Sequence, residues 1–91
     1  MSVRFRAEAA VDLRSIIDYY EEVAPEALAN IPADIHRSID QLTHFPRIGI
    51  AVTDRPFRRL VTLKYHFKVA YTVERDVIVI LGIFRHPDRE L

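Results

Sequence analysis

The sequence predicts an α+β domain in which a helical hairpin covers one face of a small, mainly antiparallel sheet, in the order β-α-α-β-β-β. Two stretches, 7–23 and 28–42, repeat apolar residues at helical spacing. Three strand-like runs then follow one another between residues 57 and 86, with connections short enough for antiparallel pairing. With 91 residues, 49% of them apolar, the chain is long enough for a single domain over 1–91 with a modest core.

The sheet is expected to be built from the second half of the chain. Residues 57–62 and 67–73 alternate β-branched or aromatic residues with polar ones, which is typical of strands with one covered face. Residues 77–86 are apolar at nearly every position, which predicts a central strand buried on both faces. Residues 74–76 separate the last two runs and predict the tip of a hairpin. The face of the sheet away from the helices should stay open.

The first half of the chain supplies an edge strand and the first helix. Residues 3–5 alternate and predict a short strand at the edge of the same sheet. Residues 7–23 predict an amphipathic helix with an apolar stripe. The stripe consists of Ala9, Leu13, Ile16, Ile17 and Tyr20.

A second helix is expected to begin at Pro25, since proline is favoured at the first helical position. Its apolar seam is Leu28, Ile31, Ile35, Ile39 and Leu42. Pro32 interrupts this pattern and would cost roughly 3 kcal/mol in a helix interior. The sequence therefore predicts either a kink or a helix that properly begins near Pro32 after an irregular turn. Residues 47–56 contain glycine and proline and predict a loop.

Composition excludes several classes of site. The chain has no cysteine, so disulfides, thiolate metal sites and cysteine nucleophiles are excluded. Its four histidines show no metal-binding spacing, and there is no glycine-rich phosphate loop, so we expect neither a metal nor a cofactor. No run of eighteen apolar residues and no signal-peptide pattern is present, so we expect a cytoplasmic protein that does not bind membranes.

The net charge of zero hides an asymmetry between the two halves of the chain. Residues 1–45 carry four arginines and eight acidic residues, whereas residues 46–91 carry nine basic and five acidic residues. Because the basic half also forms the strands, the open sheet face would suit a phosphate or an acidic partner. The alternative is that these are ordinary solvated side chains.

Several cationic residues also allow a catalytic hypothesis. Cleavage of RNA through its 2′-hydroxyl needs a base, an acid and positive charge on the phosphate. If the protein is a ribonuclease, the candidate catalytic residues are Arg59, Lys64, Arg85 and His86. The alternative is that these cations lie on solvated strand faces and that His86 ends a strand beside nearby acidic residues.

The order and spacing of these motifs resemble the RelE/ParE superfamily of bacterial toxins over essentially the whole chain. The helical motifs are Ala10, Leu13, Ile16 and Tyr19 or Tyr20, followed by Ile39, Leu42, Pro46 and Gly49. The strand motifs are Arg59, then Tyr65, Phe67, Val69 and Tyr71, then Ile80, Ile83, Arg85, His86 and Arg89.

This resemblance implies the toxin of a type II toxin–antitoxin module, of the kind that also stabilises plasmids, neutralised by a ParD-like or RelB-like antitoxin. The antitoxin would cover the helices and the sheet. Val11, Tyr19 and Val23 are the candidate antitoxin-binding residues, because they fall outside the apolar stripe of the first helix.

The superfamily has two mechanisms. RelE-type members are ribosome-dependent mRNA endonucleases that often use a tyrosine near the C-terminus, and no tyrosine follows position 71 here. ParE-type members bind and poison DNA gyrase without a hydrolytic site. The Pro46-x-x-Gly49 junction and the basic tail look more like the ParE branch, so we expect a gyrase inhibitor rather than an enzyme. The target-binding residues would be Arg58, Arg85, His86 and Arg89. An mRNA endonuclease and a nontoxic binding module on the same fold are the alternatives.

Overall fold

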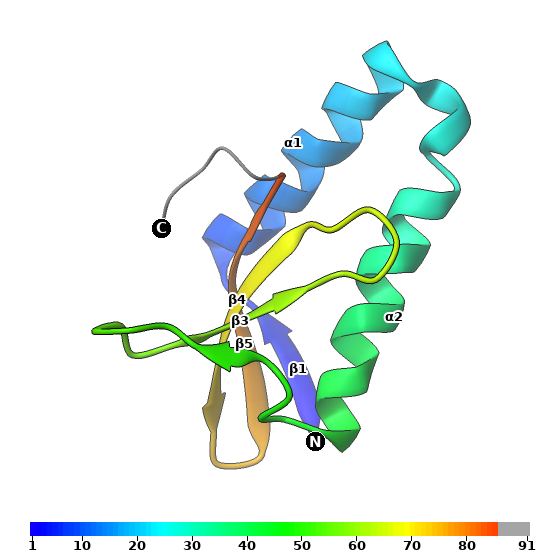
Figure 1. The fold of residues 1–91 in the computed structure, drawn as a ribbon. Coiled ribbons are helices and arrows are strands. Elements are labelled where there is room, and N and C mark those ends of the chain that lie inside the picture. The colour runs from blue at the N-terminus through cyan, green and yellow to red at the C-terminus, as the bar shows by residue number, and fades with distance from the viewer. Residues whose placement is uncertain (86–91) are drawn as a thin grey trace.

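The computed structural model describes residues 1–85 and shows two helices packed on a five-stranded, mostly antiparallel sheet, which is the predicted α+β class (Figure 1). The elements are β1 (Ser2–Phe5), α1 (Ala7–Val23), a 3-10 helix η1 (Pro25–Ala27), α2 (Asn30–His44), β2 (Ile50–Ala51), β3 (Arg58–Val61), β4 (Lys68–Glu74) and β5 (Val77–Phe84). The strand order is β1-β5-β4-β3-β2.

The sheet confirms the predicted edge strand and adds a strand that the sequence did not predict. β1 pairs in parallel with β5, and the other neighbouring strands pair antiparallel. The prediction of a loop over residues 47–56 is wrong at Ile50 and Ala51, which pair with Arg59 and Arg58 as β2. Two residues are too few to show an alternating pattern, so this edge strand left no signal in the sequence.

Both α-helices form where the apolar periodicity predicts them, and Pro32 lies where a helix accommodates proline. α1 has the predicted bounds, Ala7–Val23. The expectation that Pro25 starts the second α-helix is wrong, because Pro25 starts η1 instead. α2 begins at Asn30, so Pro32 lies in its first turn. Backbone N–H groups in a first turn have no intrahelical acceptor, so the missing N–H of Pro32 removes no helical hydrogen bond. The predicted start near Pro32 is confirmed.

β5, which lies inside the sheet between β1 and β4 and not at its centre, is irregular. Ala70 of β4 pairs with Gly82, whereas the next residue, Tyr71, pairs with Ile80, so Leu81 is an extra residue in β5. This bulge lets both Ile80 and Ile83 join the core under the helices. The strand ends at Phe84, so Arg85 is the first residue after it, and His86 lies outside the described residues.

Two carboxylates attach the helices to the sheet. Asp34 of α2 is buried and accepts hydrogen bonds from the backbone N–H groups of Lys64 (3.0 Å) and Tyr65 (2.8 Å) in the β3–β4 connection. Asp12 of α1 accepts a hydrogen bond from the backbone N–H of Ile83 (3.0 Å). The two carboxylates satisfy backbone N–H groups that would otherwise be unpaired. They attach α2 to the β3–β4 connection and α1 to β5.

Candidate binding surfaces

The loop after α2 is held by a buried tyrosine. The Tyr71 hydroxyl donates a hydrogen bond to the carbonyl oxygen of Pro46 (2.8 Å) and accepts one from the backbone N–H of Gly49 (2.9 Å). A Cβ atom at position 49 would lie 2.6 Å from the Tyr71 hydroxyl oxygen and 2.9 Å from the carbonyl oxygen of Arg59. Only glycine therefore fits where the loop crosses the tyrosine.

Arg58 takes part in the same junction. Its Nη1 donates hydrogen bonds to the carbonyl oxygens of Gly49 (2.7 Å) and Arg47 (3.4 Å), and its side chain is half-buried. Arg58 was a predicted target-binding residue. The structure gives it a role in holding the loop, with the rest of its guanidinium left for other contacts.

The face of the sheet away from the helices carries Arg59, one of the predicted catalytic residues, together with Val61 and Lys68. Leu60 is buried in the core under the helices, so Arg59 and Val61, which alternate with it on β3, face the other side. Lys68 of β4 pairs with Val61 and Arg59 pairs with Ala70, so Lys68 and Arg59 are diagonal neighbours on this face. Both side chains are half-buried. Arg59 and Lys68 therefore place two positive charges side by side on this face.

Three of the four predicted catalytic residues lie in the described part of the chain, and they come from three different segments. Arg59 lies on β3, and Lys64 is exposed in the turn between β3 and β4. The guanidinium of Arg85 lies over the ring of Tyr19, with its Cζ 3.9 Å from the ring centroid. Among residues 1–85, no hydrogen bond joins Arg59, Lys64 and Arg85. The predicted sites at His86 and Arg89 fall outside the described residues.

The three predicted antitoxin-binding residues are exposed along one flank of α1. The exposed fractions are 63% for Val11, 42% for Tyr19 and 56% for Val23. We call these three residues the outer flank. Acidic residues adjoin them, since Asp18, Glu21 and Glu22 line the same shallow pocket as Tyr19 and Val23.

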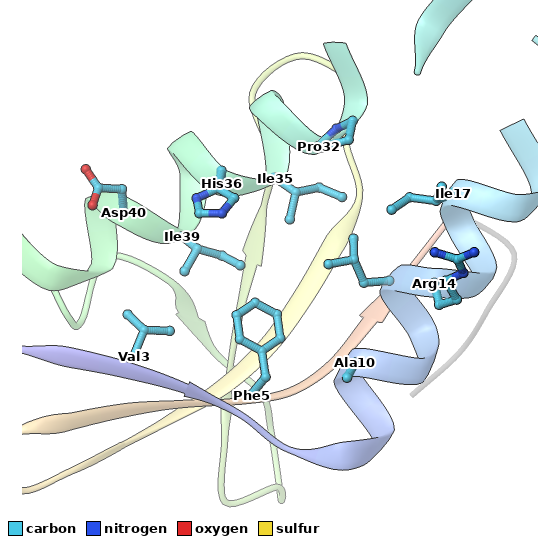
Figure 2. Close-up of a pocket in the computed structure, with 11 residues that line it drawn as sticks. Val3, Phe5, Ala10, Arg14, Ile17, Pro32, Ile35, His36, Ile39 and Asp40 are labelled. Atoms are coloured by element: carbon cyan, nitrogen blue, oxygen red, sulfur yellow. The ribbon is translucent and has the colours of Figure 1, made fainter. Parts of the chain in front are cut away.

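An apolar groove lies on the other side of α1. Its volume is about 620 Å³, and Figure 2 shows Phe5 pointing from β1 into the space between α1 and α2. The walls include Leu13 and Ile17 of α1 with Pro32, Ile35 and Ile39 of α2, and polar atoms enter only from Arg14, His36 and Asp40. At about 100° per residue, Leu13 and Ile17 lie on the opposite flank of the helix from Val11 and Tyr19.

Residues 1–85 contain neither a metal-binding cluster nor a helix that could span a membrane. Within this range no three histidine, aspartate or glutamate side chains come together in a way that would hold a metal ion. No helix in the same range is both long enough and apolar enough to span a membrane.

Comparison with known proteins identifies the family. The family described as "ParE toxin of type II toxin-antitoxin system, parDE" matches residues 3–89. The chain belongs to the ParE toxin family. A comparison with curated protein sequences gives no match. Among solved structures, a chain of the chromosomal ParDE toxin–antitoxin system from P. aeruginosa is similar, with a TM-score of 0.73 and 26% identity. The match covers 96% of this chain and 97% of that one.

The structure shows what the Pro46-x-x-Gly49 motif does in this fold. Pro46 and Gly49 provide the acceptor and the donor for the Tyr71 hydroxyl, so they position the loop of this type II toxin. The apolar groove was missed from the sequence because Leu13, Ile17, Ile35 and Ile39 have the spacing of core residues. Two sequence features could have indicated the groove. They are Pro32, which interrupts the apolar seam of the second helix, and Phe5, an aromatic residue in the predicted edge strand.

Proposed function

We propose that this ParE-family toxin arrests bacterial growth by binding DNA gyrase and that a cognate antitoxin neutralises it. The observation that carries this proposal is the ParE family match along residues 3–89, which includes every described candidate residue. The basic side chains of the C-terminal half supply a surface that would contact the gyrase–DNA complex. Arg85 and the partly free Arg58 are its described members, and His86 and Arg89 belong to the same proposal.

The chemistry of the described cations supports binding over RNA cleavage. A general base or acid must reach the proton that it moves, usually within about 3 Å of the reacting atom. Arg59, Lys64 and Arg85 come from β3, a turn and the segment after β5, and arginine is a poor proton carrier because it keeps its proton. An mRNA endonuclease is the second candidate, because Arg59 and Lys68 adjoin on the open sheet face.

Two surfaces of α1 support the antitoxin proposal. The outer flank of Val11, Tyr19 and Val23 offers exposed apolar side chains beside acidic ones. The groove on the other flank offers a deeper apolar surface, bordered by Phe5, which is 39% exposed. A partner that covered both flanks would wrap around α1 and remove from water the apolar surface that the toxin leaves uncovered.

The decisive experiment is induced expression without the neighbouring antitoxin gene, with growth, mRNA integrity and plasmid supercoiling followed in the same cells. Growth arrest with intact mRNA and lost supercoiling is the expected result. Cleaved mRNA with normal supercoiling would identify the endonuclease instead. Normal growth with confirmed accumulation of the protein would identify a nontoxic binding module.

Variants separate the two toxic mechanisms further. Substituting Arg85 or His86 by alanine in a gyrase binder should give graded losses of affinity for gyrase. In an endonuclease, removing the residue that moves the proton should abolish cleavage while RNA binding is retained. Arg4→Ala, on the opposite edge of the sheet from β2, is a matched control for the loss of one positive charge.

The antitoxin surfaces are tested by co-expression with the antitoxin and by measuring the dissociation constant of the complex. Phe5→Ala probes the groove, and Val11→Ala probes the outer flank. Each should weaken the complex if the antitoxin contacts both flanks. An affinity that neither variant changes would rule out both surfaces, whether or not the toxin poisons gyrase.

A further inference from the structure

A pocket beside β2 is lined by three arginines that arrive from different segments. Its volume is about 300 Å³. Arg47 comes from the loop after α2, Arg55 from the connection between β2 and β3, and Arg58 from the start of β3. Phe57 and Thr72, both half-buried, also line the pocket, and the Thr72 hydroxyl donates a hydrogen bond to the carboxylate of Glu74 (3.2 Å).

These positive charges have no carboxylate partners within the described residues. The ion pair found among residues 1–85 is Arg14–Asp18 on α1, far along the chain from this pocket. Asp54, the acidic residue of the same loop, makes no ion pair with any of the three arginines. Three guanidinium groups around one pocket repel one another, and an anion between them would relieve that repulsion.

The pocket is partly preorganised. Hydrogen bonds from Nη1 to the carbonyl oxygens of Gly49 and Arg47 fix the guanidinium of Arg58. The Tyr71 hydroxyl in turn fixes the loop that carries those carbonyls. The positive field reaches that hydroxyl: burial raises the pKa of Tyr71, while the hydrogen bond from Gly49 and the charges of Arg58 and Arg47 act to lower it.

We propose that Arg47, Arg55 and Arg58 form a binding site for a phosphate group. The planar guanidinium presents paired N–H donors that match two phosphate oxygens, and such charge-assisted bonds are stronger than neutral ones. The phosphate has two chemical sources, a free phosphate or nucleotide and the backbone of a nucleic acid. The site rests on this geometry alone and does not depend on gyrase being the target.

The test uses the full chain, labelled with ¹⁵N and observed by NMR, with inorganic phosphate, ATP and a short DNA duplex as separate probes. Phosphate binding should shift the arginine Nε–Hε signals of Arg47, Arg55 and Arg58 and leave that of Arg4 unchanged. Arg47→Ala and Arg55→Ala should each weaken binding about three- to tenfold. Both side chains are exposed, so these variants should unfold at the wild-type temperature.

The three probes distinguish the source of the phosphate. If phosphate and ATP shift the same arginine signals as DNA does, the site accepts a small anion. Binding of DNA alone would indicate a nucleic-acid backbone, and each removed arginine should then reduce the slope of log affinity against log salt by about 0.9.

Three results would overturn the proposal. These are the absence of shifts with all three probes, an equal loss of affinity in the matched control Arg4→Ala, and tighter binding of an acidic peptide than of any phosphate probe. The last result would assign the pocket to a protein partner.

Discussion

The guanidinium of Arg85 lies over the ring of Tyr19, with 3.9 Å between its Cζ and the ring centroid. This cation–π contact joins the segment after β5 to the outer flank of α1. One residue of the pair was predicted to bind the target and the other to bind the antitoxin. Because the two side chains touch, an antitoxin that covered Tyr19 would also displace or cover Arg85. Under the proposed function, this contact would let the antitoxin block a proposed target-binding residue.

The first prediction concerns the strength of that contact. Tyr19→Ala, Arg85→Ala and the double variant form a thermodynamic cycle, and unfolding by urea should give a coupling free energy of about 0.5–1 kcal/mol. Tyr19→Phe keeps an aromatic ring and should keep most of the coupling. If the two alanine substitutions are additive, the contact does not contribute to stability in solution.

The second prediction concerns the buried carboxylate of α2. Asp34→Asn keeps the shape of the side chain but replaces one acceptor oxygen by an amide that faces a backbone N–H. Because hydrogen bonds to charged groups are lost, the free energy of unfolding should fall by about 1.5–3 kcal/mol. The measurement is urea denaturation. Asp40→Asn, exposed on the same helix, is the matched control, and an equal loss in both variants would contradict the role of Asp34.

The third prediction compares two buried hydroxyls. Ser38 is 1% exposed, and its Oγ has no hydrogen-bond partner among residues 1–85. Thr62 is fully buried, and its Oγ1 accepts a hydrogen bond from the backbone N–H of Phe67 (2.9 Å). Ser38→Ala should therefore raise the free energy of unfolding by about 1 kcal/mol, whereas Thr62→Val should lower it by about 1–3 kcal/mol. Thermal unfolding of both variants checks the signs. A Ser38→Ala variant that lost stability would mean that the hydroxyl has a partner, such as a bound water.

The sequence predicted the elements whose pattern is local. The apolar stripe gave α1 its bounds, and the alternation over residues 67–73 predicted a strand with one covered face, on which Val69 and Tyr71 are buried. Pro32 left two possibilities, and the structure selected a helix that starts at Asn30. Each of these features depends on residues that lie close together in the chain.

The features that escaped prediction depend on distant residues. β2 forms because Ile50 and Ala51 reach the edge of β3, and the Tyr71 hydroxyl holds the preceding loop. No spacing rule joins Tyr19 to Arg85, because their contact depends on where β5 ends against α1. The groove likewise depends on how far apart the two helices lie. The sequence identifies the candidate cations but does not show which residues contact them in the fold.

The last prediction concerns alkaline pH and the buried Tyr71. Burial raises the pKa of its hydroxyl above the ordinary value of 10.0. Below this value both the folded and the unfolded chain keep the phenolic proton. Above it the unfolded chain loses the proton first, so it binds fewer protons than the folded chain, and stability falls as the pH rises through the folded pKa.

Tyr71→Phe should remove this part of the pH dependence. At neutral pH the variant should be less stable by about 1–3 kcal/mol, because the Pro46 carbonyl and the Gly49 N–H lose their partner. As the pH rises past the unfolded pKa, the gap between wild type and variant should narrow, since only the wild type loses the contribution of a protonated Tyr71. Urea denaturation over a series of alkaline pH values measures the gap. A gap between wild type and Tyr71→Phe that stayed constant would show that Tyr71 is not the source of the alkaline loss.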